Sequence, residues 1–274
     1  FYYGSLLKLE EKEELAEPVE KKEIGTIVHS ILENYFRPWK NRELRPEGLT
    51  EDALRKTMER EFIRAFGHNL SGSSFLIRQQ IENHLLDFLR HYQLPLAREY
   101  AEQKRPYHLI DLERLVDGEM KVNGEIFKVR IKIDRVERRD KDIFIIDYKT
   151  SAQEKNYEIR WSKLDPDSRE TWPKAISSLQ LPLYTFVWAQ ENQQKPEEIK
   201  AVLLLLGKNR ISRKEIEYWP FDEEQGRRRE QLDLILRVIK DLLLEIINPE
   251  IPFSSEPARE GSCRYCPYTA LCGQ

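Results

Sequence analysis

Two charged residues, Asp147 and Lys149, end an apolar run of the sequence at residues 143–146. Because side chains alternate between the two faces of a strand, this pair would project from one face. A run that is apolar on both faces is typical of a strand in the centre of a sheet, and α/β proteins place ligands where such strands end. A buried carboxylate stays ionised only beside a cation or hydrogen-bond donors, so a simple ion pair with Lys149 is the non-functional alternative.

A second carboxylate, Asp134, lies on the preceding predicted strand, on the opposite face from Val129 and Ile131. A short polar turn separates the two strands, so we expect a hairpin in which Asp134 and Asp147 converge. Two converging carboxylates bind a hard divalent cation through their oxygens, and a lysine beside them can orient an attacking water. This combination suits hydrolysis of a phosphodiester, because the cation polarises the phosphoryl oxygen and offsets negative charge in the transition state.

The elements that must position these residues include three successive strands in the middle of the chain. Apolar and β-branched residues predict strands at 107–116, 125–137 and 143–150. Asp117-Gly118 and Asn123-Gly124 supply turn signals between the first two strands. A polar segment, Arg138 to Asp142, supplies the turn before the third strand.

Helices surround these strands in the sequence. Helical spacing of apolar residues predicts helices at 24–36, 51–66 and 74–92, and a helix or loop at 96–107. The remaining elements, in chain order, are a loop at 151–172, a helix from Ser178 with Pro182 in its first turn, strands at 199–206 and 213–219, and a long helix that Asn248-Pro249 ends. This order predicts an α/β fold, with a central mixed β-sheet flanked by helices and an N-terminal helical elaboration.

The composition limits the kind of protein. The 274 residues suffice for one large domain or two modest ones, and 45 Lys and Arg against 48 Asp and Glu give no basic excess. A nucleic-acid surface would therefore be local. The arginines of residues 226–230 are one candidate, and a solvated helix face is the alternative interpretation. No stretch approaches the ~18 apolar residues of a membrane span, and no secretory signal is visible.

Three cysteines, Cys263, Cys266 and Cys272, lie within the last twelve residues with the spacing C-x2-C-x5-C. They do not form the disulfide framework of a secreted protein, and a cytoplasmic protein with a local metal site fits better. Zinc and iron–sulfur sites usually have four ligands, whereas this chain has no fourth cysteine. Three cysteines without a metal are the alternative. Because the sequence begins at Phe1 and not at methionine, we expect it to be a piece of a longer protein.

The segment IDRVERRDKDIFIIDYKTS, from Ile133 to Ser151, resembles the signature of the PD-(D/E)XK nucleases, in which an aspartate precedes a D/E-x-K motif on the next strand. It looks most like the RecB/AddB-like branch of that superfamily. Three further segments resemble pieces of that branch in the same order. They are GTIVHSILE for its histidine helix, SLQLPLY for its Q-x-x-x-Y helix and CRYCPYTALC for its carboxy-terminal cysteine cluster.

The resemblance implies a role for each matching residue. It implies that His29, Asp134, Asp147 and the backbone carbonyl of Tyr148 bind the metal, and that Lys149 orients the nucleophilic water. A structural histidine is the alternative for the first of these residues.

The resemblance also extends to residues around this set. It implies that Gln180 and Tyr184 hold the site or contact the DNA backbone, and capping of a helix face is their structural alternative. Glu113 falls at about the position of an acidic residue one strand earlier, although Glu99 and Glu102 compete for that role.

The sequence departs from the pattern of the branch in two places. Ile131 stands where the branch has a small residue, and Ile133 replaces the proline that names the superfamily. Many RecB-like members lack that proline, so the departure does not argue against activity. The larger residue at 131 would alter packing below the site.

The resemblance implies a restriction-endonuclease-like core and a Mg²⁺- or Mn²⁺-dependent deoxyribonuclease, acting as an exonuclease in DNA repair or recombination. It also implies a helicase domain or subunit as a partner. The alternatives are a catalytically silent DNA-binding or scaffold module of the same fold and a nuclease that acts on RNA.

The resemblance further implies a [4Fe–4S] cluster that the three cysteines share with a cysteine upstream of Phe1. In this chain such a cluster would be absent or incomplete. We expect one nuclease domain in three parts, namely a helical part with the His29 motif at 1–107, the nuclease core at 108–250 and the cysteine segment at 251–274.

Overall fold

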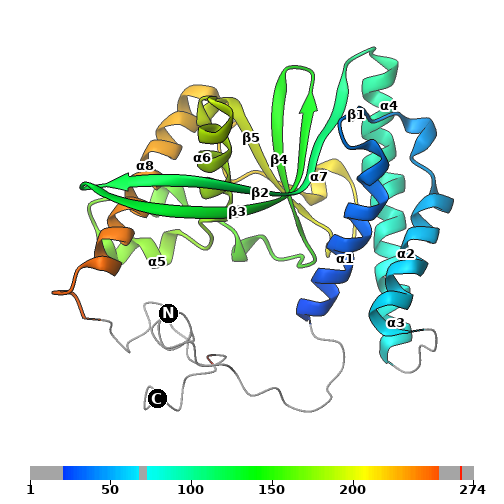
Figure 1. Ribbon diagram of the computed structural model, residues 1–274, viewed down its shortest axis with the longest axis horizontal. Helices are drawn as coiled ribbons and strands as arrows, with labels where there is room; N and C mark the ends of the chain where they lie inside the picture. The colour runs from blue at the N-terminus through cyan, green and yellow to red at the C-terminus, as the bar shows by residue number, and fades with distance from the viewer. Residues whose placement is uncertain (1–20, 68–72, 253–265, 267–274) are drawn as a thin grey trace.

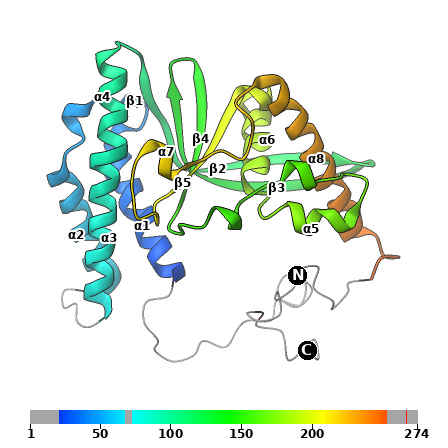
Figure 2. The same ribbon diagram turned by 180° about the vertical axis from the view of Figure 1, so that it is seen from behind.

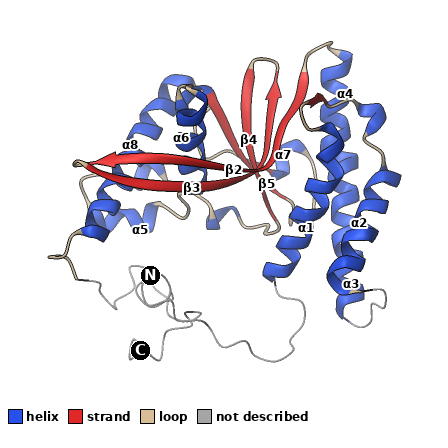
Figure 3. Ribbon diagram, viewed as in Figure 1, coloured by secondary structure: helices blue, strands red, loops and turns tan. Residues whose placement is uncertain are grey.

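The computed structural model describes residues 21–67, 73–252 and Cys266, and in these ranges helices cover both faces of a mixed six-stranded sheet (Figure 1 and Figure 3). The strands are β1 (Arg42–Glu43), β2 (Tyr107–Val122), β3 (Glu125–Arg139), β4 (Asp142–Lys149), β5 (Ile199–Leu205) and β6 (Glu217–Tyr218). The α-helices are α1 (Lys21–Phe36), α2 (Glu51–Phe66), α3 (Ser73–Phe88), α4 (Leu94–Glu102), α5 (Trp172–Ala175), α6 (Gln180–Asn192), α7 (Arg213–Ile216) and α8 (Gln225–Ile247). The predicted α/β fold with a helical part in front is confirmed.

The strands follow one another across the sheet in chain order. Neighbouring strands are antiparallel except β4 and β5, which are parallel. A parallel pair needs a crossover connection, and the segment that contains α5 and α6 supplies it. The long hairpin of β2 and β3 turns at Asn123-Gly124, whose φ angles of 48° and 87° suit a type I′ turn. The expected hairpin of β3 and β4 is also present.

The prediction of a turn at Asp117-Gly118 is wrong, because β2 continues through both residues. Gly118 lies under α6, where a Cβ would stand 2.9 Å from a methyl carbon of Val187 and 2.8 Å from the Gln190 side chain. The glycine therefore allows the helix to approach the strand closely. The sequence cannot separate this role from a turn until the partner helix is known.

Two helical layers pack on opposite faces of the central strands β4 and β5 (Figure 1 and Figure 2). Helices α1 to α4 cover the face with Ile146 and Tyr148, whereas α6 and α8 cover the face with Leu203 and Leu205. Burial on both faces explains why these strands are almost continuously apolar. None of the helices in the described ranges is both long and apolar enough to cross a bilayer.

Two further boundaries differ from the expectation. The strand predicted at 213–219 is wrong over most of its length, because its first residues form α7 and only β6 pairs with β5. Ile216 is fully buried in α7, and one buried apolar residue suits a strand or a short helix equally well, so the apolar pattern did not discriminate. The α-helix predicted at 74–92 is present as α3, which ends at Phe88. A π-helical segment, Leu89–Gln93, follows it and leads directly into α4.

One face of β3 carries a row of buried charges, which we call the buried ion network and define as Arg135, Glu137 and Arg139. Each is at most 1% exposed. Glu137 is ion-paired to Arg135 and accepts a hydrogen bond of 2.8 Å from Arg139 Nε. Tyr107 of β2 also donates to Glu137 at 2.7 Å, and Arg135 donates to the hydroxyl of Tyr148 at 3.1 Å. The network therefore ties β3 to both of its neighbouring strands.

Candidate active site

Three acidic residues lie in a row across neighbouring strands of the sheet. The pairs Leu112–Arg135 and Arg114–Ile133 of β2 and β3 lie on either side of Glu113 and place it opposite Asp134. The register of β3 and β4, extended by one residue past its last pair, places Asp147 on the other side of Asp134. Because residues opposite each other in antiparallel strands project from the same face, the three carboxylates gather there.

Asp134 ends the ladder between β3 and β4. Its Oδ2 accepts a hydrogen bond of 2.7 Å from the backbone N–H of Tyr148, in the place of a strand carbonyl. Its Oδ1 lies 3.3 Å from Nδ1 of His29. The other ring nitrogen of His29, Nε2, lies 3.1 Å from the carbonyl oxygen of Tyr148. Helix α1 thus brings His29 against the end of β4 and against the middle of β3, where the pairing of these two strands ends.

Glu113 completes a compact group with these two side chains. Its Oε1 lies 3.8 Å from Nδ1 of His29, and its other oxygen is ion-paired to Lys132. One potential ligand atom from each of His29, Glu113 and Asp134 lies within 4.8 Å of the others. Glu113 has a φ of 48°, which is rare for a strand residue other than glycine. Such strained conformations persist where surrounding contacts hold them, and they are frequent at functional sites.

Asp147, Lys149, Gln180 and Tyr184 form a second cluster beside this group. Lys149 Nζ lies 2.7 Å from Oδ2 of Asp147 and donates to Oε1 of Gln180 at 2.7 Å. The amide nitrogen of Gln180 donates to Oδ1 of Asp147 at 2.6 Å and to the hydroxyl of Tyr184 at 2.8 Å. Helix α6 begins at Gln180, so its first turn presents both residues to the end of β4.

The electrostatics of the first group favour a protonated histidine. Burial acts to lower the pKa of His29, but hydrogen bonds with Asp134 and Glu113 outweigh it and raise the pKa to about 10. Burial acts to raise the pKa of Glu113, whereas its contacts with His29 and Lys132 hold it below the usual value. The imidazolium therefore faces two carboxylates and one carbonyl oxygen.

At Asp147, unlike at His29, the surroundings disfavour the charged form of the side chain. Burial, and then the charge of Asp134, raise its pKa to about 7, although Lys149 acts to lower it. The side chain is 2% exposed. An aspartate that is this reluctant to ionise requires added positive charge, and a strongly perturbed carboxyl is characteristic of functional sites.

The donor set fits a hard divalent cation. Two carboxylates, an imidazole and the Tyr148 carbonyl are ligands that Mg²⁺ and Mn²⁺ accept. The His29 imidazolium already contacts the acceptors that a cation would bind, so their arrangement suits a positive charge. Cation binding through His29 would require this ring to lose its proton.

The structure brings together the predicted residues His29, Asp134, Tyr148, Lys149, Asp147, Gln180 and Tyr184, and it adds Glu113 to the ligand group. The oxygens of Asp147 contact Lys149 and Gln180 and are not part of that group. Of the acids that competed with Glu113, Glu99 lies in α4 beside Arg105 and Arg213, at 4.0 and 3.7 Å, and Glu102 is also in α4.

Two sets of predicted residues lie elsewhere. Cys263 and Cys272 are outside the described residues, and Cys266 alone does not test a cluster. In the arginine segment of α8, Arg228 is 7% exposed and donates to backbone carbonyls, including that of Glu223 at 2.7 Å. Arg227 and Arg229 are exposed and pair with nearby acids, so this segment is mainly a solvated helix face.

Sequence reasoning missed Lys132 and the buried ion network. Lys132 lies two residues before Asp134 on the same face of β3, and its exposed ammonium group pairs with Glu113. The alternation R-x-E-x-R at 135–139 was a signal of same-face ion pairs. Nothing in that alternation indicates that its face is the buried one.

Comparison with known proteins identifies a family. A profile of the PD-(D/E)XK nuclease superfamily matches residues 1–273. No curated protein gave a significant match. The chain is also similar to the protein of "Crystal structure of SSO0001", at 18% sequence identity over 90% of this chain and 94% of that chain, with a TM-score of 0.31.

The fold and the site therefore define a nuclease-type α/β domain with a carboxylate-rich centre at the end of its central strands. The chain belongs to the PD-(D/E)XK nuclease superfamily.

Proposed function

We propose that this chain is a Mg²⁺- or Mn²⁺-dependent nuclease that hydrolyses phosphodiester bonds of DNA. The observation that carries the proposal is the convergence of His29, Glu113 and Asp134, whose potential ligand atoms lie within 4.8 Å of one another, beside the Asp147–Lys149 pair. Oxygen-rich sites of this kind favour hard cations over zinc.

A bound cation would polarise a phosphoryl oxygen and make an attacking water more acidic. His29, Glu113 and Asp134 would hold it, together with the Tyr148 carbonyl. The carboxylate of Asp147 would join them once the cation reduces the cost of its ionisation. This assignment uses Glu113 as a ligand, which the resemblance alone left open.

Lys149 is suited to orient the attacking water. An ammonium group has three donors, and in the described structure Asp147 and Gln180 engage two of them. The third donor can point a water at the phosphorus or contact a phosphoryl oxygen. Gln180 fixes both partners, because its amide donates to Asp147 and accepts from Lys149.

The finer proposals concern biological context. We infer an exonuclease of the RecB/AddB-like type that works in DNA repair beside a helicase, with the three parts 1–107, 108–250 and 251–274 in one domain. Cys263, Cys266 and Cys272 would share a [4Fe–4S] cluster with a further cysteine. The sequence segments that resemble that branch support these inferences.

The test is a cleavage assay on linear single- and double-stranded DNA and on RNA, with Mg²⁺, with Mn²⁺ and with EDTA. We expect DNA cleavage that requires a metal and that Asp147→Asn abolishes. Asp142→Asn is the matched control, because this carboxylate lies on the same strand but pairs at the surface with Lys200, at 2.7 Å. Cleavage in EDTA, or activity retained by Asp147→Asn, would refute the mechanism, and cleavage of RNA alone would refute the substrate.

A further inference from the structure

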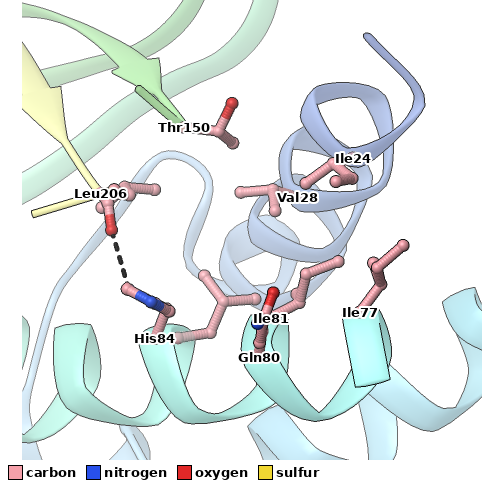
Figure 4. A pocket seen from close by; sticks show the side chains of 10 residues that line it. Ile24, Val28, Ile77, Gln80, Ile81, His84, Thr150 and Leu206 are labelled. Carbon is pink, nitrogen blue, oxygen red and sulfur yellow. Dashed lines mark hydrogen bonds between the residues drawn. The ribbon is translucent and has the colours of Figure 1, made fainter. Parts of the chain in front are cut away.

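A pocket of about 240 Å³ lies next to the candidate active site, between α1, α3 and the ends of β4 and β5. Figure 4 shows Ile24 and Val28 of α1 facing Ile77 and Ile81 of α3 across it. Thr150 lies at the end of β4, so the pocket has two aliphatic walls and a polar end.

The lining contains no Asp, Glu, Lys or Arg, and it has one histidine. The ten residues are Ile24, Val28, Ile77, Gln80, Ile81, His84, Leu85, Thr150, Leu206 and Gly207. His84 Nδ1 lies 3.1 Å from the carbonyl oxygen of Leu206, which can only accept, so this nitrogen carries the proton. In the neutral ring Nε2 is then an acceptor. Gln80, Thr150 and His84 thus offer both donors and acceptors around an apolar slot.

The pocket and the candidate active site share their elements. Val28 precedes His29 on α1, and Thr150 follows Lys149 at the end of β4. Because side chains alternate along a strand, Thr150 projects toward α1, from the opposite face to Lys149. The pocket therefore lies on the α1 and α3 side of the end of β4, and the Asp147–Lys149 pair lies on the α6 side. Gly207 allows the segment after β5 to pack closely against the end of β4, because a Cβ at this position would overlap the carbonyl oxygen of Thr150.

We propose that this pocket takes one unpaired base of the nucleic acid, from the nucleotide next to the scissile phosphate. The inference rests on the proposed nuclease function and adds a single-stranded segment to its substrate. A base is flat and mostly apolar on its faces, with hydrogen-bonding groups at its edge, and pockets for extruded bases combine these two features. A phosphate or a charged peptide side chain would find no fixed partner in this lining.

The geometry favours a base over a base pair. The volume of about 240 Å³ is closed on two sides by α1 and α3, so a single ring system fits between the walls. One side is accessible, since Gln80 is exposed and Ile77 is only partly buried. A base can therefore approach the pocket from this open side.

The test uses a single-stranded DNA oligonucleotide in which a tetrahydrofuran abasic site replaces each nucleotide in turn. Binding is measured by fluorescence anisotropy in Ca²⁺, and cleavage of the intact strand is measured in parallel in Mg²⁺. We expect one abasic position to weaken binding about tenfold, in the range of one base contact. Two variants fill the pocket, Ile77→Trp and, at its exposed side, Gln80→Trp. Each should bind the intact strand as weakly as the wild type binds the strand with that abasic position, and the abasic position should not weaken their binding further.

The matched control is Leu76→Trp, because Leu76 is the preceding residue of α3, is 59% exposed and does not line the pocket. It should keep the wild-type abasic profile. Three results would overturn the proposal. In the first, which we call a flat profile, the affinity of the wild type is the same at every abasic position. In the second, one abasic position weakens binding by the wild type and by the pocket variants alike, and in the third the wild type does not bind the strand. A flat profile with metal-dependent cleavage would overturn the pocket and leave the nuclease intact. The expected profile without cleavage would support the pocket and refute the nuclease.

Discussion

The buried ion network provides a sharp test of how the site is held. Glu137→Gln keeps the shape of the side chain and removes its charge. It leaves Arg135 and Arg139, each at most 1% exposed, with Glu217 as the remaining nearby carboxylate among the described residues. Removal of one member of a buried ion pair costs about 3–5 kcal/mol, because the remaining charge stays buried. Domains are stable by about 5–15 kcal/mol, so the variant should lose at least about a fifth of that stability.

The pH dependence of this loss has a definite sign. Burial acts to raise the pKa of Glu137, but the two arginines outweigh it and lower the pKa below 4.5. The carboxylate therefore contributes its full stabilisation above about pH 4.5, and the contribution falls as the pH drops through the lowered value. The difference between wild type and Glu137→Gln should be constant near neutral pH and narrow below pH 4.5.

The assay is urea unfolding followed by tryptophan fluorescence, at several pH values. Glu61→Gln is the matched control, because Glu61 is also only 6% exposed but its arginine partners, Arg60 and Arg64, are exposed and stay solvated without it. Its hydrogen bond from Ser30 is one that glutamine can accept as well. The loss of stability in Glu61→Gln should be about 1 kcal/mol or less. If Glu137→Gln is fully unfolded, Glu137→Asp keeps the charge and allows the comparison. Equal losses for Glu137→Gln and Glu61→Gln, or a gap that does not narrow in acid, would refute the reasoning.

Three further predictions concern the site and its surroundings. In EDTA at pH 8, Asp147→Asn should be more stable than wild type by up to about 4 kcal/mol, because burial raises the pKa of Asp147 from 3.8 to about 7. This advantage should disappear near pH 4 in urea unfolding, and a constant or reversed difference would contradict it. Gln180→Ala should lower the cleavage rate about 10–100-fold, because Asp147 and Lys149 lose the side chain that orients them, and Tyr184→Phe should lower the rate less. Equal cleavage rates for the two variants would argue against this role of Gln180. Gly207→Ala should lower the stability measured by thermal unfolding by about 1–3 kcal/mol, because the new Cβ would overlap the Thr150 carbonyl oxygen. Gly226→Ala is the control and should leave the stability unchanged, because its Cβ would have its nearest contact at 3.8 Å.

The sequence was most informative where the chemistry is local. Asp147 and Lys149 are two residues apart, so a strand alone places them on one face, and their contact of 2.7 Å follows from that spacing. Asp134 was predictable from the hairpin. Gln180 and Tyr184 were predictable from one helical turn, and they are joined by a hydrogen bond of 2.8 Å.

The sequence was least informative where the partner is distant in the chain. Which of Glu113, Glu99 and Glu102 lies beside Asp134 depends on the register of β2 against β3, which the alternation of the strand does not reveal. Gly118 was misread as a turn because its partner, α6, lies about 70 residues later and glycine permits either role. The buried ion network needed knowledge of which face of β3 is covered.

Asp134 and Asp147 have opposite effects on the folded chain, and this bears on how relatives that have lost activity should evolve. Asp134 supplies the acceptor that ends the ladder between β3 and β4, so an inactive descendant would keep it for architecture alone. Asp147 is costly to ionise in its buried position, so selection for stability alone would replace it. In this chain the first aspartate is therefore weaker evidence for catalysis than the second. The hydrogen bond to the backbone of Tyr148 accounts for Asp134 without any chemistry, whereas no contact within the described residues makes the ionised Asp147 favourable for folding.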